Sequence, residues 1–207
     1  MKKVIITTAL VAVTAVTAFA QGKVTMLYQI PASLVTLTSD TSKVLAADVA
    51  QAGTAVGNLV PLASGKTLVA GLYAGPANSA VAGPYAPRAG DARGYILNNV
   101  AWGAGIIPAT TYQLNAAGVL PALPAGATTV QVKVWDASYA TYEAAYTAAS
   151  YVGQSSTFQF TTGGSVTYPN IMTSLTTPIV VALVPEPTVA AIAGLGIASM
   201  LVFRRRK

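Results

Sequence analysis

Residues 128–135 carry the pattern that most constrains how this chain folds. Valines alternate there with polar side chains, in the order Val130, Gln131, Val132, Lys133 and Val134. Because successive side chains of a strand point to opposite faces of a sheet, this alternation predicts a β-strand with one buried face. A strand of this kind needs partner strands, which the rest of the chain must supply.

Weaker alternation predicts those partners over residues 23–30, 33–38, 66–73, 95–102, 111–115, 155–162 and 179–183. Glycine and proline separate them, and residues 74–94 are typical of a long loop. One segment changes period, because Tyr139, Tyr142 and Tyr146 stand at helical spacing and predict an α-helix over residues 138–150. We therefore expect a mainly β fold, an antiparallel β-sandwich of about seven to eight strands with one short α-helix.

The first twenty residues have the three parts of a secretory signal peptide. Lys2 and Lys3 form its positive region, residues 4–16 are apolar, and Ala18 and Ala20 are the small residues of a cleavage site. An N-terminal signal-peptide helix over residues 1–20 is therefore expected, with the Sec translocon and signal peptidase as partners. An N-terminal membrane anchor is disfavoured because the apolar region is short. Residues 21–183, the predicted β-sandwich domain, then lie outside the cytoplasm.

Residues 184–207 also divide into three parts. Pro185, Glu186 and Pro187 form a stiff, extended segment because the two prolines exclude helix. An uncharged apolar run over residues 189–203 predicts a C-terminal transmembrane helix, although it rises only about 22 Å against a hydrocarbon core of roughly 30 Å. Four cations follow and stay on the cytoplasmic side by the positive-inside rule: Arg204, Arg205, Arg206 and Lys207.

This C-terminal arrangement resembles the PEP-CTERM sorting signal of Gram-negative bacteria, with Pro185, Glu186 and Pro187 as the motif. The resemblance implies recognition by an exosortase, a membrane protease or transpeptidase, with residues 204–207 as the stop-transfer cluster and the inner membrane as a transient anchor. Residues 130–136, 142–145 and 71–77 are similar to segments of exported β-sandwich proteins with such tails, which supports the fold and implies no activity. The alternative is an ordinary single-span tail anchor with a chance Pro-Glu-Pro.

The formal net charge of +6 comes entirely from the two ends of the chain. Outside residues 1–20 and 204–207, the Lys and Arg residues equal the Asp and Glu residues in number, so the exported part is neutral. A neutral domain without a basic patch lacks the electrostatic footprint that phosphate backbones require. Nucleic acid is therefore excluded as a partner.

The chain contains neither histidine nor cysteine. Ser-His-Asp and Cys-His catalysis and the common zinc sites are therefore excluded, and no disulfide can form. A small hydrolase with two positioned carboxylates is a remote option, because the spacing of the acids marks no pair. We expect no enzyme activity and no cofactor.

Three groups of residues are candidate binding sites. Asp136 and Glu143 could join backbone carbonyls in a calcium site, but the favoured interpretation is a strand end near a helix N-terminus and a solvated helix residue. Tyr139, Tyr142 and Tyr146, with Tyr151 nearby, could stack on sugars, but at helical spacing they more often form the buried face of a helix. Tyr85, Tyr95 and Trp102 are a second unspecific group of the same kind.

The sequence thus favours an exported, non-enzymatic protein of the cell surface or extracellular matrix, sorted by its C-terminal tail and released, attached, or held in exopolysaccharide. The rival hypothesis is a carbohydrate-binding β-sandwich module displayed by the same tail. The two differ in whether an aromatic side chain of the domain is exposed and able to bind glycans.

Overall fold

The computed structural model describes residues 23–26, 35–56, 61–85, 95–97, 110–113, 126–162, 170–175 and 177–185. The predicted signal-peptide helix over residues 1–20 and the predicted membrane segment over residues 189–203 lie outside these ranges. Within them, none of the helices combines the length and the apolar character that crossing a bilayer requires.

The described part of the chain is mainly β, as the alternating pattern predicts. Its strands are β1 (Lys23–Met26), β2 (Val35–Leu37), β3 (Leu68–Pro76), β4 (Ala82–Tyr85), β5 (Tyr95–Ile96), β6 (Thr110–Gln113), β7 (Gly126–Asp136), β8 (Tyr151–Gln154), β9 (Phe158–Thr162) and β10 (Ile179–Leu183). One α-helix, α2 (Tyr142–Thr147), accompanies them, with the 3₁₀ segments η1 (Thr41–Lys43), η2 (Ala46–Gln51) and η3 (Ile171–Ser174).

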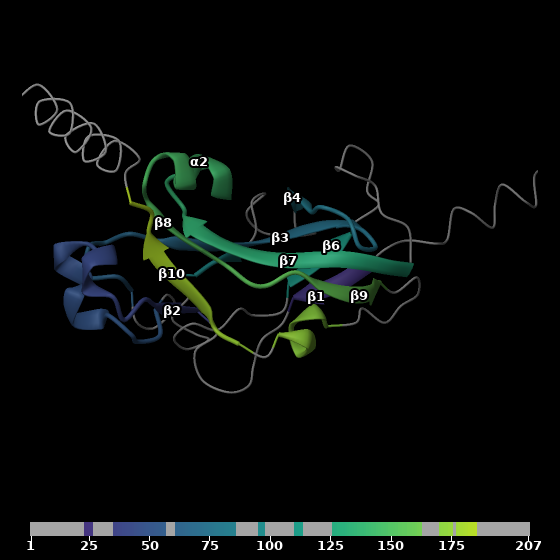
Figure 1. Ribbon diagram of the computed structural model, residues 1–207, viewed down its shortest axis with the longest axis horizontal. Coiled ribbons are helices and arrows are strands. Elements are labelled where there is room, and N and C mark those ends of the chain that lie inside the picture. Colours follow the sequence, from purple (N-terminus) through teal and green to yellow (C-terminus); the bar gives the residue numbers. More distant parts are fainter. Residues whose placement is uncertain are drawn as a thin grey trace, which may run out of the picture.

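Strand β7, which contains the alternating valines, lies at the centre of an eight-stranded sheet among the described residues (Figure 1). Along one side it pairs with the whole of β3, from Leu68 opposite Asp136 to Pro76 opposite Thr128. Its other side is shared by β8, which pairs near Trp135, and β9, which pairs near Val130. The strand order is β2-β10-β8-β7-β3-β4, with β5 also on β3, and β1 and β6 form a separate two-stranded sheet.

The large sheet is mixed, which corrects the expectation of a purely antiparallel sandwich. Strand β10 is antiparallel to β8 but parallel to β2, with Ile179 opposite Val35. Alternation within single strands carries no information about the direction of their partners, so the sequence pattern could not reveal this pair. Beyond β2, Leu37 donates its N–H to the carbonyl of Thr54 at 2.9 Å, so the chain itself covers this edge of the sheet.

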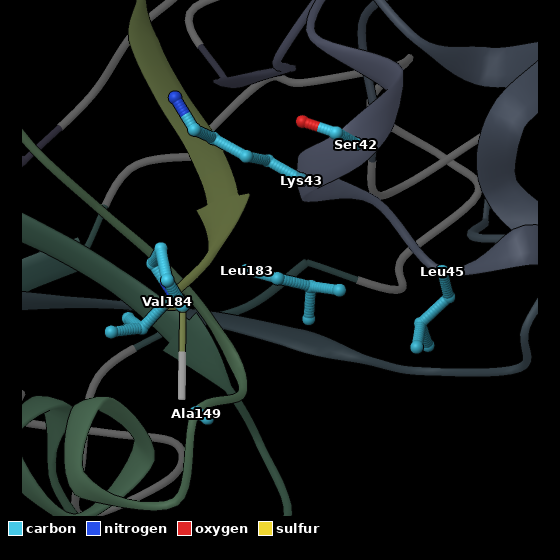
Figure 2. Close-up of a pocket in the computed structure, with 7 residues that line it drawn as sticks. Ser42, Lys43, Leu45, Ala149, Leu183 and Val184 are labelled. Atoms are coloured by element: carbon cyan, nitrogen blue, oxygen red, sulfur yellow. The ribbon is translucent and has the colours of Figure 1, made fainter. Parts of the chain in front are cut away.

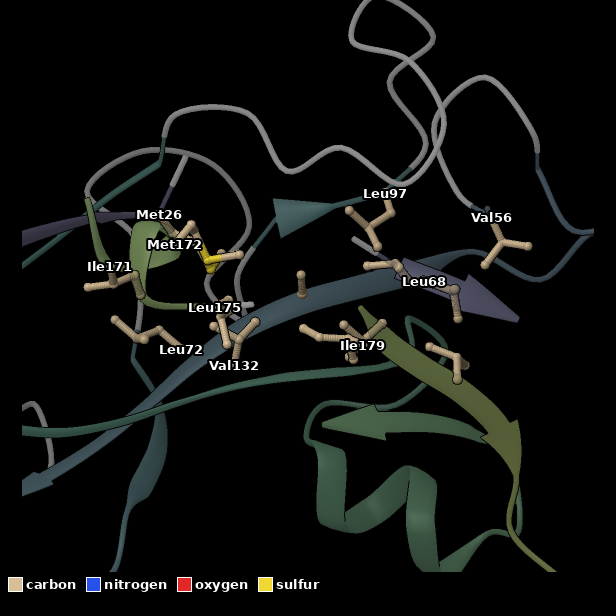
Figure 3. Packing of buried hydrophobic residues seen from close by; sticks show 14 of the residues in the cluster. Met26, Val56, Leu68, Leu72, Leu97, Val132, Ile171, Met172, Leu175 and Ile179 are labelled. Atoms are coloured by element: carbon tan, nitrogen blue, oxygen red, sulfur yellow. The ribbon is translucent and has the colours of Figure 1, made fainter. Parts of the chain in front are cut away.

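The main hydrophobic cluster lies on one face of the large sheet, which we call the inner face (Figure 3). Val130, Val132 and Val134 of β7 contribute to it, as the alternation predicts. Strand β1 and segment η3 close it from the other side, through Val24, Met26, Ile171 and Met172, all of which are buried. In the described part the second layer is therefore a short two-stranded sheet with 3₁₀ segments.

The opposite, outer face is covered in part by α2, which Figure 3 shows on the far side of the strands from the main cluster. A smaller hydrophobic cluster lies beneath the helix, and we call it the outer cluster. It is formed by Val69, Tyr73, Trp135, Ala145 and Val152. The rings of Tyr73 and Trp135 meet edge to face with centroids 6.3 Å apart. Strand β7 thus buries side chains on both faces, so its polar alternate positions do not mark a solvent face.

Three sequence expectations about single elements need correction. Strand β4 lies in the predicted loop 74–94, because Pro84 and its neighbouring glycine hide an edge strand. Strand β8 was not predicted, since four residues are too few to show a period. Helix α2 begins at Tyr142 rather than at residue 138, because the hydroxyl of Thr141 accepts the N–H of Ala144 at 3.2 Å and caps it.

Gly153 of β8 provides a test of how β10 is seated. A Cβ atom at this position would collide with the carbonyl oxygen of Val180 and lie 3.0 Å from Cγ2 of Val181. Because backbone of a neighbouring strand cannot step aside as a side chain does, we expect Gly153→Ala to lower the free energy of unfolding by about 1–3 kcal/mol. Urea unfolding measures this loss. Ser156→Ala, at an exposed position nearby, should change stability little, and equal effects of both variants would contradict the close approach of β8 and β10.

Candidate functional site

Asp136 and Glu143 do not converge on a common site. Asp136, the last residue of β7, is buried, and its carboxylate accepts from Lys66 Nζ at 2.7 Å, Ser150 Oγ at 2.7 Å and the N–H of Ser138 at 2.9 Å. Glu143 lies in the first turn of α2 with its side chain 57% exposed. Its Oε1 accepts from Lys133 Nζ at 2.8 Å.

Each of these two acids therefore has its own lysine, which leaves little reason for a calcium ion to bring them together. In the described ranges no group of three or more acidic, histidine or cysteine side chains could hold a metal ion. The favoured interpretation of Asp136 also needs correction, because Thr141 caps α2 while Asp136 forms a buried ion pair.

Opposing effects set the pKa of Asp136. Burial alone would raise the pKa, but the hydrogen bonds from Lys66, Ser138 and Ser150 together hold it below its usual value. The hydrogen bond between Lys66 and Asp136 also raises the pKa of Lys66, because the ammonium donates to the carboxylate. A carboxylate held ionised by these partners cannot act as a general acid near neutral pH.

A second polar cluster, the outer-face cluster, consists of Tyr73, Lys133, Tyr142 and Glu143. Lys133 Nζ lies 4.0 Å from the ring centroid of Tyr73 and 4.6 Å from that of Tyr142, so the ammonium contacts both rings. The hydroxyl of Tyr73 donates to Glu143 Oε2 at 3.0 Å. Burial first, and then the charge of Glu143, raises the pKa of Tyr73, which keeps its hydroxyl a donor.

The tyrosines of the predicted helical stripe differ in their exposure. Tyr139 and Tyr142 are half-buried against the outer cluster, whereas Tyr146 is 53% exposed. The expectation that all three form a buried face is therefore wrong for Tyr146. Within α2 it is Ala145, rather than the next residue Tyr146, that is buried.

Other aromatic residues of the candidate groups are not available to a ligand or fall outside the described side chains. Tyr85 is buried, and burial raises its pKa to about 12. Tyr151 is buried in the main cluster. Trp102 and the side chain of Tyr95 lie outside the described residues. Of the tyrosines considered, Tyr146 is the one exposed aromatic ring that the structure describes.

Asp48 is a buried acid that no sequence pattern singles out. Its carboxylate accepts from the hydroxyl of Tyr151 at 2.7 Å and from the N–H of Ser64 at 2.7 Å. The hydroxyl of Tyr151 in turn accepts the N–H of Leu45 at 2.8 Å. These bonds tie the segment around η2 to strand β8, so Asp48 is explained as a structural residue.

The tail segment leaves the domain beside an open hollow of about 430 Å³ (Figure 2). The hollow is lined by Ser42, Lys43, Leu45, Ala149, Leu183, Val184 and Pro185. Lys43 is its cation and already pairs with Asp40 at 3.1 Å, at the surface. Of the predicted sorting residues, Pro185 lies here and is exposed; Glu186, Pro187, Arg204–Lys207 and the cleavage residues Ala18 and Ala20 lie outside the described ranges.

The buried ion pair makes stability depend on pH through Asp136. A carboxyl group whose pKa is lower in the folded than in the unfolded protein stabilises the fold, and this contribution is complete above the unfolded pKa of about 3.9. The contribution is lost as pH falls through the pKa of the folded protein. We expect Asp136→Asn to lower the free energy of unfolding by about 2–3 kcal/mol at pH 7. This is less than the full cost of breaking a buried ion pair, because Lys66 is partly exposed to solvent. The deficit should shrink as pH falls from 5 to about 2, because wild type is then protonated as well.

Urea unfolding at several pH values measures this difference between the variant and the wild type. Asp40→Asn is the matched control, because Asp40 also pairs with a lysine but is exposed, and its effect should be small at every pH. A deficit for Asp136→Asn that stays constant with pH would contradict an ionised Asp136 in the folded state.

Two surface features thus remain as candidate functional sites, the hollow where the tail begins and the exposed Tyr146 beside the outer-face cluster. No protein-family model, curated protein or solved structure matches the chain.

Proposed function

We propose that the chain is an exported, non-enzymatic protein of the cell surface or extracellular matrix, sorted by its C-terminal tail through an exosortase-type system. The observation that carries the proposal is the position of β10, the strand that leads into the tail. It lies inside the sheet between β2 and β8 and is followed within two residues by the exposed Pro185. A membrane enzyme would meet Pro185, the first residue of the Pro-Glu-Pro motif, at the surface of an ordered domain.

The same position suits a domain held by its tail. Tension on the chain that follows Leu183 would enter a strand that is hydrogen-bonded on both sides, with Ala182 opposite Val152 and Val181 opposite Leu37. Force along the axis of this strand would load the hydrogen bonds on both of its sides together. We include in this proposal the two-layer sandwich expected from the sequence, which describes the mainly β domain in more detail.

The chemistry of the described acids supports a non-enzymatic role. Asp40, Asp136 and Glu143 each pair with a lysine, and Asp48 is held by the hydroxyl of Tyr151. A hydrolase of the two-carboxylate kind needs one acid poised to donate a proton beside another that stays ionised. None of these four is arranged in that way with a partner acid.

A carbohydrate-binding module displayed by the same tail is the second candidate. The observation that favours it is Tyr146, whose exposed ring stacks on Tyr142 with an interplanar angle of 27°. The two candidates share export and sorting and differ in whether the domain has a ligand.

Sorting is tested by the intact mass of the protein found outside the cell. We expect extracellular material to lack residues 1–20 and the membrane segment and basic cluster of the tail, because a protein that keeps an apolar run would stay in the membrane. A variant with Glu186→Ala and Pro187→Ala should accumulate in the membrane fraction with its tail intact. Asp40→Asn, which removes an exposed acid of the domain, should be processed normally. Extracellular protein with an unprocessed C-terminus would refute the proposal.

A further inference from the structure

The side chain of Tyr146 is one of three large hydrophobic side chains exposed in the described part of the chain, with Val49 and Val180. An exposed aliphatic side chain is common at a protein surface and needs no explanation. Tyr146 differs because its ring is held by a neighbour, with its centroid 6.3 Å from that of Tyr142 in a stacked arrangement. The ring is therefore both accessible and fixed in orientation.

Tyr142 is itself held in place by the outer-face cluster. Its ring is contacted by Lys133 Nζ, which also lies against Tyr73 and donates to Glu143. The side chain of Lys133 is only 12% exposed. The result is a row of rings and one ammonium that begins in the buried outer cluster and ends in solvent at Tyr146. A rigid row of this kind loses little conformational freedom on binding a ligand.

Hydrogen-bonding groups lie along this row. Glu143 is largely exposed, and each of its carboxylate oxygens keeps a lone pair beyond the bonds to Lys133 and Tyr73. Gln154, which is exposed, lies opposite Lys133 in the β7–β8 register, on the same face of the sheet. An aromatic face with acceptors and an amide near it can contact both the apolar and the polar side of one ligand.

The charge balance of the site limits the class of ligand. Lys133 and Glu143 neutralise each other at 2.8 Å, so the site has no free cation for a phosphate or carboxylate and no free anion for an ammonium. A neutral pyranose matches what remains. Its C–H face can cover the ring of Tyr146, while its hydroxyls, which donate and accept, bond to Glu143, three residues earlier in α2.

We propose that Tyr146, supported by Tyr142 and Lys133 and flanked by Glu143, is a binding site for neutral polysaccharide, with Gln154 opposite Lys133 as a further contact. This deepens the second candidate function and rests on export to a place where such polymers occur. A single exposed ring gives weak binding, in the millimolar range. Many copies displayed on one surface would bind a polymer more tightly through multivalency.

The test is affinity electrophoresis of the full chain, purified in a detergent without a sugar headgroup. The gels contain, in turn, dextran, laminarin, xylan and the anionic polygalacturonate. We expect at least one neutral polymer to retard the protein, and Tyr146→Ala to weaken that binding by about tenfold or more. Tyr146→Trp should retain binding, and Tyr146→Leu should lose it, because leucine keeps apolar area but has no aromatic face. Val180→Ser is the matched control at another exposed hydrophobic residue and should bind as wild type does.

Three outcomes would overturn the proposal: no retardation by any of the neutral polymers, retardation by polygalacturonate alone, or undiminished binding by Tyr146→Leu. Thermal unfolding of each variant checks that the domain stays folded. Tyr146 is far in sequence from both ends, so its variants should be exported and processed with the same intact mass as wild type. A failure of glycan binding is thereby separated from a failure of sorting.

Discussion

The antiparallel ladder between β3 and β7 is the interaction on which the rest of the described structure depends. It joins the two longest strands along the full length of β3, from Leu68 to Pro76. Strands β4 and β5 attach only to β3, and β8 and β9 attach to β7, so this ladder connects the two halves of the sheet. Both strands bury side chains on both faces, which is how one ladder can support the main cluster and the outer cluster together.

One end of this ladder is fixed by the buried carboxylate of Asp136. Lys66 precedes β3, Asp136 ends β7 and Ser150 precedes β8, so a single carboxylate binds the ends of three neighbouring strands. A buried charge is stable only when it is paired and hydrogen-bonded, and these contacts satisfy that requirement. Asp136 therefore acts through geometry: it sets where β8 starts, and β8 in turn pairs with β10, the strand that leads to the tail.

How much of this the sequence could predict depended on the length of each pattern. The valines of β7 predicted a strand and the face it buries, because alternation over several residues is a strong signal. The same alternation suggested a solvent face for Gln131 and Lys133, yet Gln131 is buried and donates to the carbonyl of Ser155 at 2.8 Å. The second face is covered by α2. This is a tertiary contact, which a local sequence period cannot predict.

The candidate sites were harder to predict for a related reason. Asp136 and Glu143 were selected as a pair because they are close in sequence, but their lysine partners come from elsewhere. Lys66 lies about seventy residues before Asp136, and Lys133 belongs to the neighbouring strand rather than to the helix of Glu143. Tyr146 was assigned to a buried stripe because the three tyrosines stand at helical spacing. Helix α2 buries Ala145 and leaves Tyr146, the next residue, exposed, which spacing alone does not reveal.

The outer cluster connects the two surface features that remain. Val184, the residue after β10, packs against this cluster, and so does Tyr142, which supports the exposed ring of Tyr146. The path from the root of the tail to the exposed ring therefore runs through a few packed side chains instead of a loop. If the tail attaches the protein to a surface, the orientation of Tyr146 relative to that attachment is set through Tyr142, which packs against the same cluster as Val184 and stacks on Tyr146. The outer cluster under α2 thus contributes more than stability, because the orientation of the Tyr146 ring depends on its packing.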